Sequence, residues 1–163
     1  GALGDYSVAI LKSYPEMNAD VLELPQSCAL ALEYIESMGL GSRLKFIEGD
    51  YRKALPDKNY DVVLLANVLR GEKKADAEQL LASILSVLTP GGMLLLYDLF
   101  PDTTAGHSGM LAGFFGLHLP EALNPSSKHL CAMLLAAGFV DVSVISMENP
   151  IVANRLVTAY APN

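Results

Sequence analysis

The stretch GALGDYSVAILKSYPEMNADVLELP, residues 1–25, decides the fold because it contains a turn, a helix and a strand in succession. Residues 1–4 form a Gly-x-x-Gly turn. The amphipathic pattern of residues 5–14 predicts a helix, which Pro15 ends, and residues 19–24 predict a short strand. A glycine turn of this type normally follows a buried strand, and none precedes it in this sequence. The turn is the first candidate for a ligand-binding element.

The alternation of helix and strand patterns continues along the chain. Helices are predicted over residues 26–39, 74–88 and 125–138, and strands over residues 43–49, 60–69, 92–100, 139–147 and 154–162. The apolar run of residues 60–69 predicts a strand that is buried on both faces. Alternating strands and helices predict an α/β, Rossmann-like, doubly wound and mostly parallel sheet. The last two strands alternate apolar and polar residues, so we expect an antiparallel carboxy-terminal pair.

The composition indicates one domain over residues 1–163. Apolar residues make up 52% of the chain and charged residues 18%, which is enough for a core and too little charge for disorder. The net charge of −7 disfavours nucleic acid as a partner. No apolar run is long enough to span a membrane. Cys28 and Cys131 form no CxxC pair and are expected to be reduced thiols in a cytoplasmic protein without a metal site.

The residues that follow each strand are the candidates for ligand binding, because such sheets bind ligands at the carboxyl ends of their strands. Gly1 and Gly4 would let the backbone approach a ligand closely, although a simple tight turn explains them equally well. Glu23 lies 19 residues after Gly4, where a nucleotide-binding fold holds ribose hydroxyls. The alternative for Glu23 is a solvated acid at a strand end.

Two further strand ends carry polar residues. Asp50 could accept a hydrogen bond from an exocyclic amine, and Tyr51 beside it could stack on a flat ring. The alternative is a Gly-Asp turn, which is common. Asn67 lies late in a predicted buried strand, where its amide needs hydrogen-bond partners from a ligand or a neighbouring loop.

Taken together, these features resemble the class I S-adenosylmethionine-dependent methyltransferases, and most closely the catalytic domain of plant and bacterial small-molecule O-methyltransferases. The matching stretches cover nearly the whole chain in the family's order: residues 1–25, LKFIEGDY, YDVVLLANVL, LTPGGMLLLYD and LLAAGFVDVSV. The resemblance implies S-adenosylmethionine as the cofactor and a small, aromatic acceptor molecule. The residues that it implies in cofactor binding are Gly1, Gly4, Glu23, Leu24, Asp50, Tyr51 and Asn67.

The sequence departs from the family pattern at its start. The family motif begins with a central strand, an acidic residue and a further glycine before the position of Gly1, and these are absent from the sequence. Two neighbouring strands would then lack a partner. Ala2 replaces a glycine that is usual in this turn. The family's N-terminal dimerisation domain is also absent, so we expect either a missing N-terminal segment or a homodimer.

The family's usual catalytic histidine is also absent. Many of these enzymes carry the histidine base shortly after the fourth strand, where this chain has Arg70, which cannot act as a base. His107, in a glycine-rich loop, is the best remaining candidate base, although a structural role is the more common one for a lone histidine. Met110, Phe114 and Phe115 could line the acceptor site or pack in the core.

Three functions are consistent with these observations. The first is methyl transfer to a small acceptor. The second is a non-catalytic or fragmentary module of the same fold, completed by another segment or chain. The third is a dinucleotide oxidoreductase, which is disfavoured because the Gly-x-Gly-x-x-Gly run is incomplete.

Overall fold

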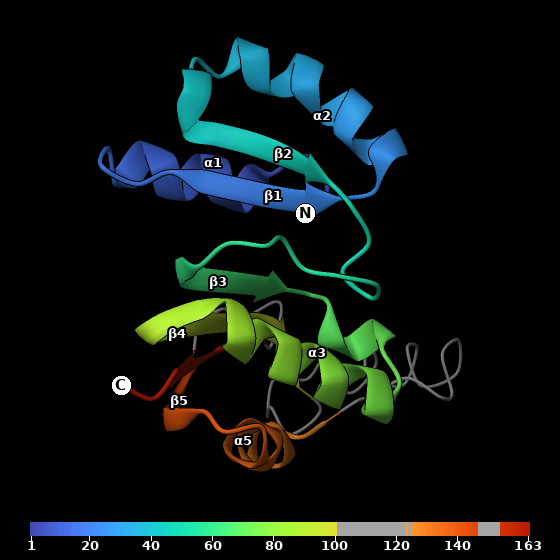
Figure 1. The fold of residues 1–163 in the computed structure, drawn as a ribbon, viewed down its shortest axis with the longest axis vertical. Coiled ribbons are helices and arrows are strands. Elements are labelled where there is room, and N and C mark those ends of the chain that lie inside the picture. The colour runs from blue at the N-terminus through green and yellow to red at the C-terminus, as the bar shows by residue number, and fades with distance from the viewer. Residues whose placement is uncertain (101–122, 124, 147–153) are drawn as a thin grey trace. The chain divides into compact units, whose positions relative to one another are not determined.

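The computed structural model describes residues 1–100, 123, 125–146 and 154–163 (Figure 1). The chain divides into two compact units, residues 1–57 and 58–163. Each unit has its own sheet, with two strands in the first and four in the second.

The first unit packs two helices and a short 3₁₀ turn around a parallel strand pair. Its elements are α1 (Asp5–Ser13), β1 (Ala19–Glu23), α2 (Pro25–Ser37), η1 (Gly41–Arg43) and β2 (Leu44–Glu48). Strand β1 pairs with β2 in parallel register from Ala19 opposite Leu44 to Glu23 opposite Glu48. Val8 and Leu11 lie one turn apart on α1 and are buried against Val21 of β1. Tyr14, which directly follows α1, is 61% exposed.

Arg43 joins the end of α1 to the start of β2. Its Nη1 donates hydrogen bonds to the carbonyl oxygens of Leu11 at 3.1 Å and Pro15 at 3.0 Å. A guanidinium at this position satisfies carbonyl groups that the end of a helix leaves without partners.

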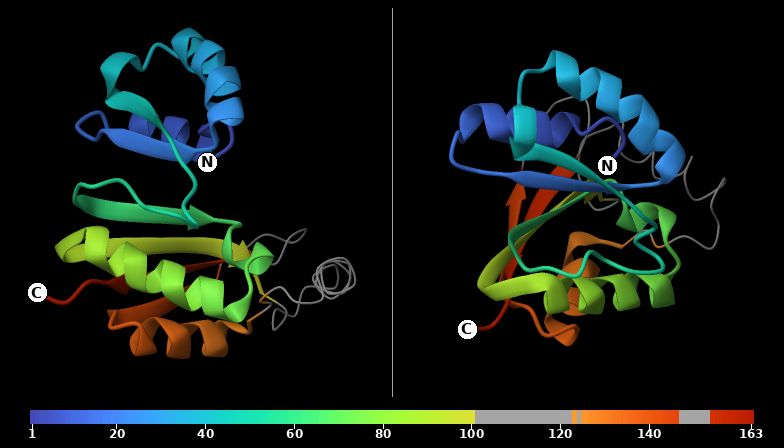
Figure 2. Two further views of the ribbon diagram at one scale, coloured as in Figure 1. Left: turned by 45° about the vertical axis from the view of Figure 1, so that its right-hand side comes forward. Right: turned by 45° about the horizontal axis from the view of Figure 1, so that its top comes forward.

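The second unit is built on a mixed four-stranded sheet. Its elements are β3 (Tyr60–Ala66), η2 (Leu69–Gly71), α3 (Lys74–Val87), β4 (Leu88–Leu99), α5 (Ser127–Ala136), β5 (Val140–Ser146) and β6 (Asn154–Tyr160). The strand order is β3-β4-β6-β5. Strands β3 and β4 are parallel, and β6 is antiparallel to both β4 and β5, which confirms the predicted carboxy-terminal pair. Figure 2 shows β3 and β4 side by side, with α3 running along the sheet.

The core of the second unit comes from both helices and from the central strands. Its fully buried side chains include Leu81 and Ile84 of α3, Leu94 and Leu96 of β4, Leu130 and Leu134 of α5, and Val157 of β6. The leucines of β4 alternate along the strand, as the two-residue period of a strand requires when one face is buried. The carboxyl ends of β3 and β4 are thereby held in a fixed register.

Two strand boundaries differ most from the prediction. The strand predicted over residues 60–69 ends at Ala66, because Asn67 adopts a left-handed conformation with φ of 56° and η2 follows. Most residues of β3 are half-buried, so the prediction of burial on both faces was wrong. The strand predicted from residue 92 begins at Leu88, and its register with β3 is irregular between Tyr60 and Val62. The segment TPGG, residues 89–92, thus belongs to β4, where it forms an irregularity in the strand.

Strands β1 and β3 each have one hydrogen-bonded neighbour within the described part of the chain. Strand β1 pairs with β2, and β3 pairs with β4. Each strand therefore presents one edge of backbone groups that no described strand pairs, which is the pattern expected from the sequence.

Candidate functional site

The glycine turn packs directly onto the strand that follows α1. The amide of Gly4 donates to the carbonyl of Gly1 at 2.9 Å, and Gly4 has a φ of 78°. A Cβ atom on Gly1 would overlap Cγ1 of Val21, and one on Gly4 would lie 3.1 Å from the ring of Phe46. Both glycines are therefore required by the packing of the turn, whether or not a ligand also uses it.

The Glu23 carboxylate at the end of β1 lies against this turn. Its Oε2 accepts hydrogen bonds from the Gly1 amino terminus at 2.7 Å and from the Ala2 amide at 2.8 Å. Its Oε1 accepts from the Leu24 amide at 2.8 Å. An ionised carboxylate offers about four acceptor positions, so the three contacts do not exhaust it. The structure thus brings together four of the predicted site positions, those of Gly1, Gly4, Glu23 and Leu24.

Hydrogen bonds keep Glu23 ionised. Burial by itself raises the pKa of Glu23. Hydrogen bonds from the Gly1 nitrogen and from the Leu24 and Ala2 amides outweigh burial and hold the pKa below its usual value of 4.5. At neutral pH the group is an anion that can only accept hydrogen bonds, which suits it to a neighbouring diol.

Ala2 adopts a left-handed conformation with φ of 48°. A non-glycine residue in this region costs about 1–2 kcal/mol. A glycine would adopt this backbone conformation at position 2 without strain. This agrees with the glycine that is usual at this position in the family that the sequence resembles. The strain persists because Glu23 holds the Ala2 amide in place.

Asp50 and Tyr51 belong to the turn that follows β2. Asp50 Oδ1 accepts from the Arg52 amide at 3.0 Å, and the Asp50 carbonyl accepts from the Lys53 amide at 2.8 Å. The Arg52 guanidinium lies 5.1 Å from the centre of the Tyr51 ring. The Gly49 amide donates to the Glu23 carbonyl at 2.9 Å and so joins the ends of β1 and β2. Asp50 therefore stabilises the turn after β2, as the Gly-Asp turn alternative predicts. It lies at the same edge of the sheet as Glu23.

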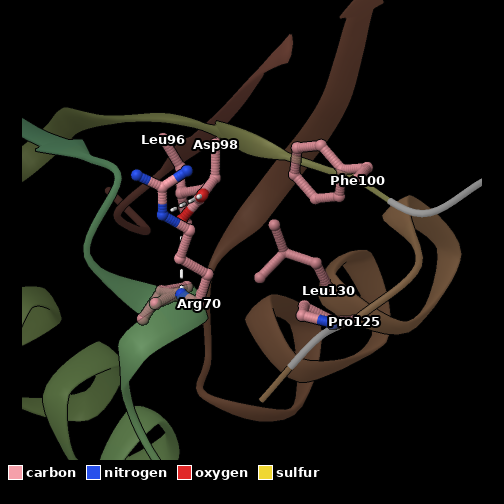
Figure 3. A pocket seen from close by; sticks show the side chains of 7 residues that line it. Arg70, Leu96, Asp98, Phe100, Pro125 and Leu130 are labelled. Atoms are coloured by element: carbon pink, nitrogen blue, oxygen red, sulfur yellow. Dashed lines mark hydrogen bonds and ion pairs between the residues drawn. The ribbon is translucent and has the colours of Figure 1, made fainter. Parts of the chain in front are cut away.

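In the second unit, Asn67 and Arg70 follow β3. The backbone N–H of Asn67 donates to the Tyr97 carbonyl at 2.8 Å and ties the end of β3 to β4. The Arg70 amide donates to Asp98 Oδ2 at 3.4 Å, and Arg70 Nε lies 3.8 Å from Asp98 Oδ1 (Figure 3). The Asp98 side chain is 5% exposed and that of Arg70 is 26% exposed. The buried carboxylate of Asp98 thus orients Arg70. Arg70 stands at the position where we expected a catalytic base.

Asp98 was not predicted from the sequence. The signal that could have found it is an acid near the end of the apolar run MLLLYDLF, the same strand-end position that singled out Glu23 and Asp50. Asp98 and Arg70 line a small hollow together with apolar residues. The residues that line it are Leu69, Arg70, Leu96, Asp98, Phe100, Pro125 and Leu130 (Figure 3).

Several predicted residues lie outside the described part of the chain. They are His107, Met110, Phe114 and Phe115. Within the described residues, no group of three or more His, Cys, Asp or Glu side chains could hold a metal ion. No helix formed by those residues is both long and apolar enough to cross a membrane.

Comparison with known proteins identifies a family that agrees with the resemblance seen in the sequence. The model of the O-methyltransferase domain family matches residues 1–140. The chain is 29% identical over 164 residues to the N,N-dimethyltransferase OxyT of Streptomyces rimosus, covering 99% of this chain and 47% of OxyT. It is 35% identical over 98 residues to the aclacinomycin 10-hydroxylase RdmB of Streptomyces purpurascens, covering 60% of this chain and 26% of RdmB.

A solved structure gives the same fold. The chain superposes on the mitomycin 7-O-methyltransferase MmcR with a TM-score of 0.88 and 24% identity, covering 99% of this chain and 47% of MmcR. The expected α/β, Rossmann-like fold is thus confirmed. The chain spans about half the length of OxyT and of MmcR.

Proposed function

The chain belongs to the O-methyltransferase domain family, and from this premise we propose that it transfers a methyl group from S-adenosylmethionine to a small aromatic acceptor. The observation that carries the proposal is the Glu23 carboxylate, which is ionised, holds spare acceptor capacity and lies against the glycine turn. A glycine turn beside a carboxylate at the end of the next strand is suited to binding the ribose of a nucleoside.

The residues of the first unit fit the cofactor by their chemistry. Glu23 would accept hydrogen bonds from the ribose hydroxyls, and Gly1 and Gly4 would admit the methionine portion beside the start of α1. Leu24, which is 40% exposed, would contact the adenine together with Tyr51. The Asp50 carboxylate, whose Oδ1 accepts from the Arg52 amide, would also accept a hydrogen bond from the adenine amine. In the second unit, Asn67 would lie towards the acceptor.

S-adenosylmethionine supplies an activated methyl group when it is bound. The protein's contribution is to align the acceptor with that methyl group and to exclude water, because transfer is an in-line displacement whose rate depends on alignment. Arg70 keeps its proton at neutral pH, so it cannot remove one from the acceptor. His107 remains the candidate base, with Met110, Phe114 and Phe115 as candidate acceptor contacts.

The proposal extends to the setting of the protein. Within the described residues, neither Cys28 nor Cys131 forms a disulfide, which suits a cytoplasmic protein. Strands β1 and β3 each present an edge that no described strand pairs, so we propose that their sheets are completed by further residues of the same protein or by a second copy. Sedimentation of the purified chain would test this: a stable monomer of 17.4 kDa contradicts completion by a second copy or by further residues.

Calorimetric titration with S-adenosylhomocysteine tests the proposed function. We expect saturable binding, and Glu23→Gln should weaken it at least tenfold, because a hydrogen bond to a charged group contributes about 1.5–3 kcal/mol. Glu48→Gln is the matched control, since Glu48 lies opposite Glu23 in the strand pair and is exposed. Absence of binding at millimolar ligand by a folded sample contradicts the proposal.

The second candidate is a protein of this fold that does not transfer methyl groups. Two observations favour it: Arg70 occupies the expected base position, and the relative with 35% identity is a hydroxylase by name. Binding of S-adenosylhomocysteine without methylation of any phenol or amine in a panel would favour this candidate over the first.

A further inference from the structure

We propose that the buried thiol of Cys28 is a positioning residue, which holds the end of β1 so that the Glu23 carboxylate is oriented for the ribose of S-adenosylmethionine. Cys28 acts through the backbone of Glu23 and not through a contact with the cofactor. This inference rests on the proposed binding of S-adenosylmethionine and adds to it the residue that keeps Glu23 in place.

Cys28 lies in the first turn of α2, directly beside the end of β1. Leu24 alone separates Glu23, the last residue of β1, from Pro25, the first residue of α2 (Figure 1). This short connection brings the start of the helix back against the strand end. The Cys28 residue is 2% exposed, so its side chain can interact with the protein interior but not with a bound molecule.

The Cys28 thiol donates a hydrogen bond to the backbone of β1. Its Sγ lies 3.4 Å from the Glu23 carbonyl oxygen, whereas the Ile47 carbonyl oxygen of β2 is 4.0 Å away. A thiol has a single proton to donate, so the shorter contact is the stronger one. Burial raises the pKa of the Cys28 thiol, and the negative charges of Glu48 and Glu23 raise it further. The thiol therefore keeps its proton, and its function as a donor, at neutral pH.

The Glu23 carbonyl is thereby held from two directions. The Gly49 amide donates to it at 2.9 Å, from the residue that follows β2, and the Cys28 thiol donates to it from α2. A carbonyl oxygen has two lone pairs, so these two donors can occupy both. Rotation of the peptide group at the end of β1 would break both hydrogen bonds, and the thiol thus adds a second restraint to the one from the neighbouring strand.

Three hydrogen bonds form a closed ring through Glu23, Leu24 and Cys28. The Leu24 amide donates to Glu23 Oε1 at 2.8 Å, and the Cys28 amide donates to the Leu24 carbonyl at 3.0 Å. The Cys28 thiol completes the ring at the Glu23 carbonyl. The Glu23 side chain and its own backbone are therefore tied to the same helical turn, and removal of the thiol would open the ring.

The orientation of Glu23 affects how well it can hold two neighbouring hydroxyls. Hydrogen bonds weaken steeply as they depart from a linear geometry, so a carboxylate that accepts from both hydroxyls must point in a defined direction. A supporting residue that fixes this direction before binding lowers the cost of ordering the site. A hydrogen bond from a thiol is weak, and its loss corresponds to about a two- to fivefold change in Kd.

Calorimetric titration with S-adenosylhomocysteine tests this role. Cys28→Ala should weaken binding about two- to fivefold, and Cys28→Ser, which again places a donor at this position, should recover most of that loss. Cys131→Ala is the matched control, because it removes the same chemical group from α5 in the second unit. We expect this control to leave the affinity unchanged.

A double-mutant cycle with Glu23→Gln separates positioning from a purely structural role. If Cys28 acts through the Glu23 carboxylate, Cys28→Ala should weaken binding much less in the Glu23→Gln background than in the wild-type background. Equal losses in the two backgrounds would overturn the role of Cys28 while the proposed function stands. Unchanged binding by Cys28→Ala, or a Cys28→Ser variant as weak as Cys28→Ala, would overturn it in the same way.

A second variant covers the case in which Cys28→Ala fails to fold. Cys28→Val fills the space of the thiol without a donor, so weakened binding by this variant supports the role and unchanged binding contradicts it. Failure of the folded wild-type protein to bind S-adenosylhomocysteine overturns the proposed function and this inference with it.

Discussion

The glycine turn offers the sharpest test of how the first unit is built. Gly4 and Gly39 both adopt left-handed conformations, with φ of 78° and 67°. A Cβ atom on Gly39 would meet nothing within 4 Å, whereas one on Gly4 would lie 3.1 Å from Cζ of Phe46. Substituting alanine at the two positions therefore separates backbone strain from side-chain contact within one unit.

The expected magnitudes follow from these geometries. Left-handed alanine costs about 1–2 kcal/mol, and the reduced entropy of the unfolded chain returns about 0.4–1 kcal/mol. Gly39→Ala should thus destabilise the protein by about 0.5–1 kcal/mol. Gly4→Ala carries the same cost and must also displace the Phe46 ring, which adds about 1 kcal/mol or more.

Urea unfolding of the two variants measures the difference. We expect a lower midpoint for Gly4→Ala than for Gly39→Ala, and weaker binding of S-adenosylhomocysteine only in Gly4→Ala, since its turn carries the Ala2 amide that contacts Glu23. Equal destabilisation by both substitutions would refute the reasoning, because it would mean that Phe46 does not restrict the turn.

Two further predictions concern the carboxylates of Glu23 and Asp98. Because its hydrogen bonds lower the pKa of Glu23, its ionised form contributes stability that is fully present above pH 4.5 and is lost as the pH falls below that value. The urea midpoint of Glu23→Gln should therefore change less with pH than that of the wild-type protein below pH 4.5. If the two midpoints change in parallel with pH, the lowered pKa of Glu23 is contradicted. Asp98→Asn should destabilise the protein by about 2 kcal/mol, because it leaves Arg70 beside an uncharged amide, while Asp57→Asn at an exposed position should cost less than about 0.5 kcal/mol. Thermal unfolding measures both, and equal costs would argue against a structural role for the buried acid.

Much of the fold follows from local patterns in the sequence. The pattern of residues 5–14 and its stop at Pro15 locate α1 to within one residue, because amphipathic spacing and helix ends are encoded over a few positions. The contact of Glu23 with the glycine turn also follows from sequence spacing, since a turn, a helix and a strand of fixed length return the chain to its start.

Other features depend on contacts that sequence patterns do not record. Apolar residues continue past Ala66, so periodicity could not show that Asn67 turns the chain into η2. The pairing of Arg70 with Asp98 joins residues 28 positions apart and exists only because β3 and β4 are parallel and in this register. Arg43 reaches back 32 positions to the end of α1, and no local signal marks it.

A crystal structure of the protein with S-adenosylhomocysteine is the most direct test of the central claim. The account predicts that both ribose hydroxyls donate to the Glu23 carboxylate, within about 3 Å, beside the turn from Gly1 to Gly4. A ligand whose ribose lies away from Glu23, with the carboxylate still occupied only by the Ala2 and Leu24 amides and the Gly1 nitrogen, would contradict it.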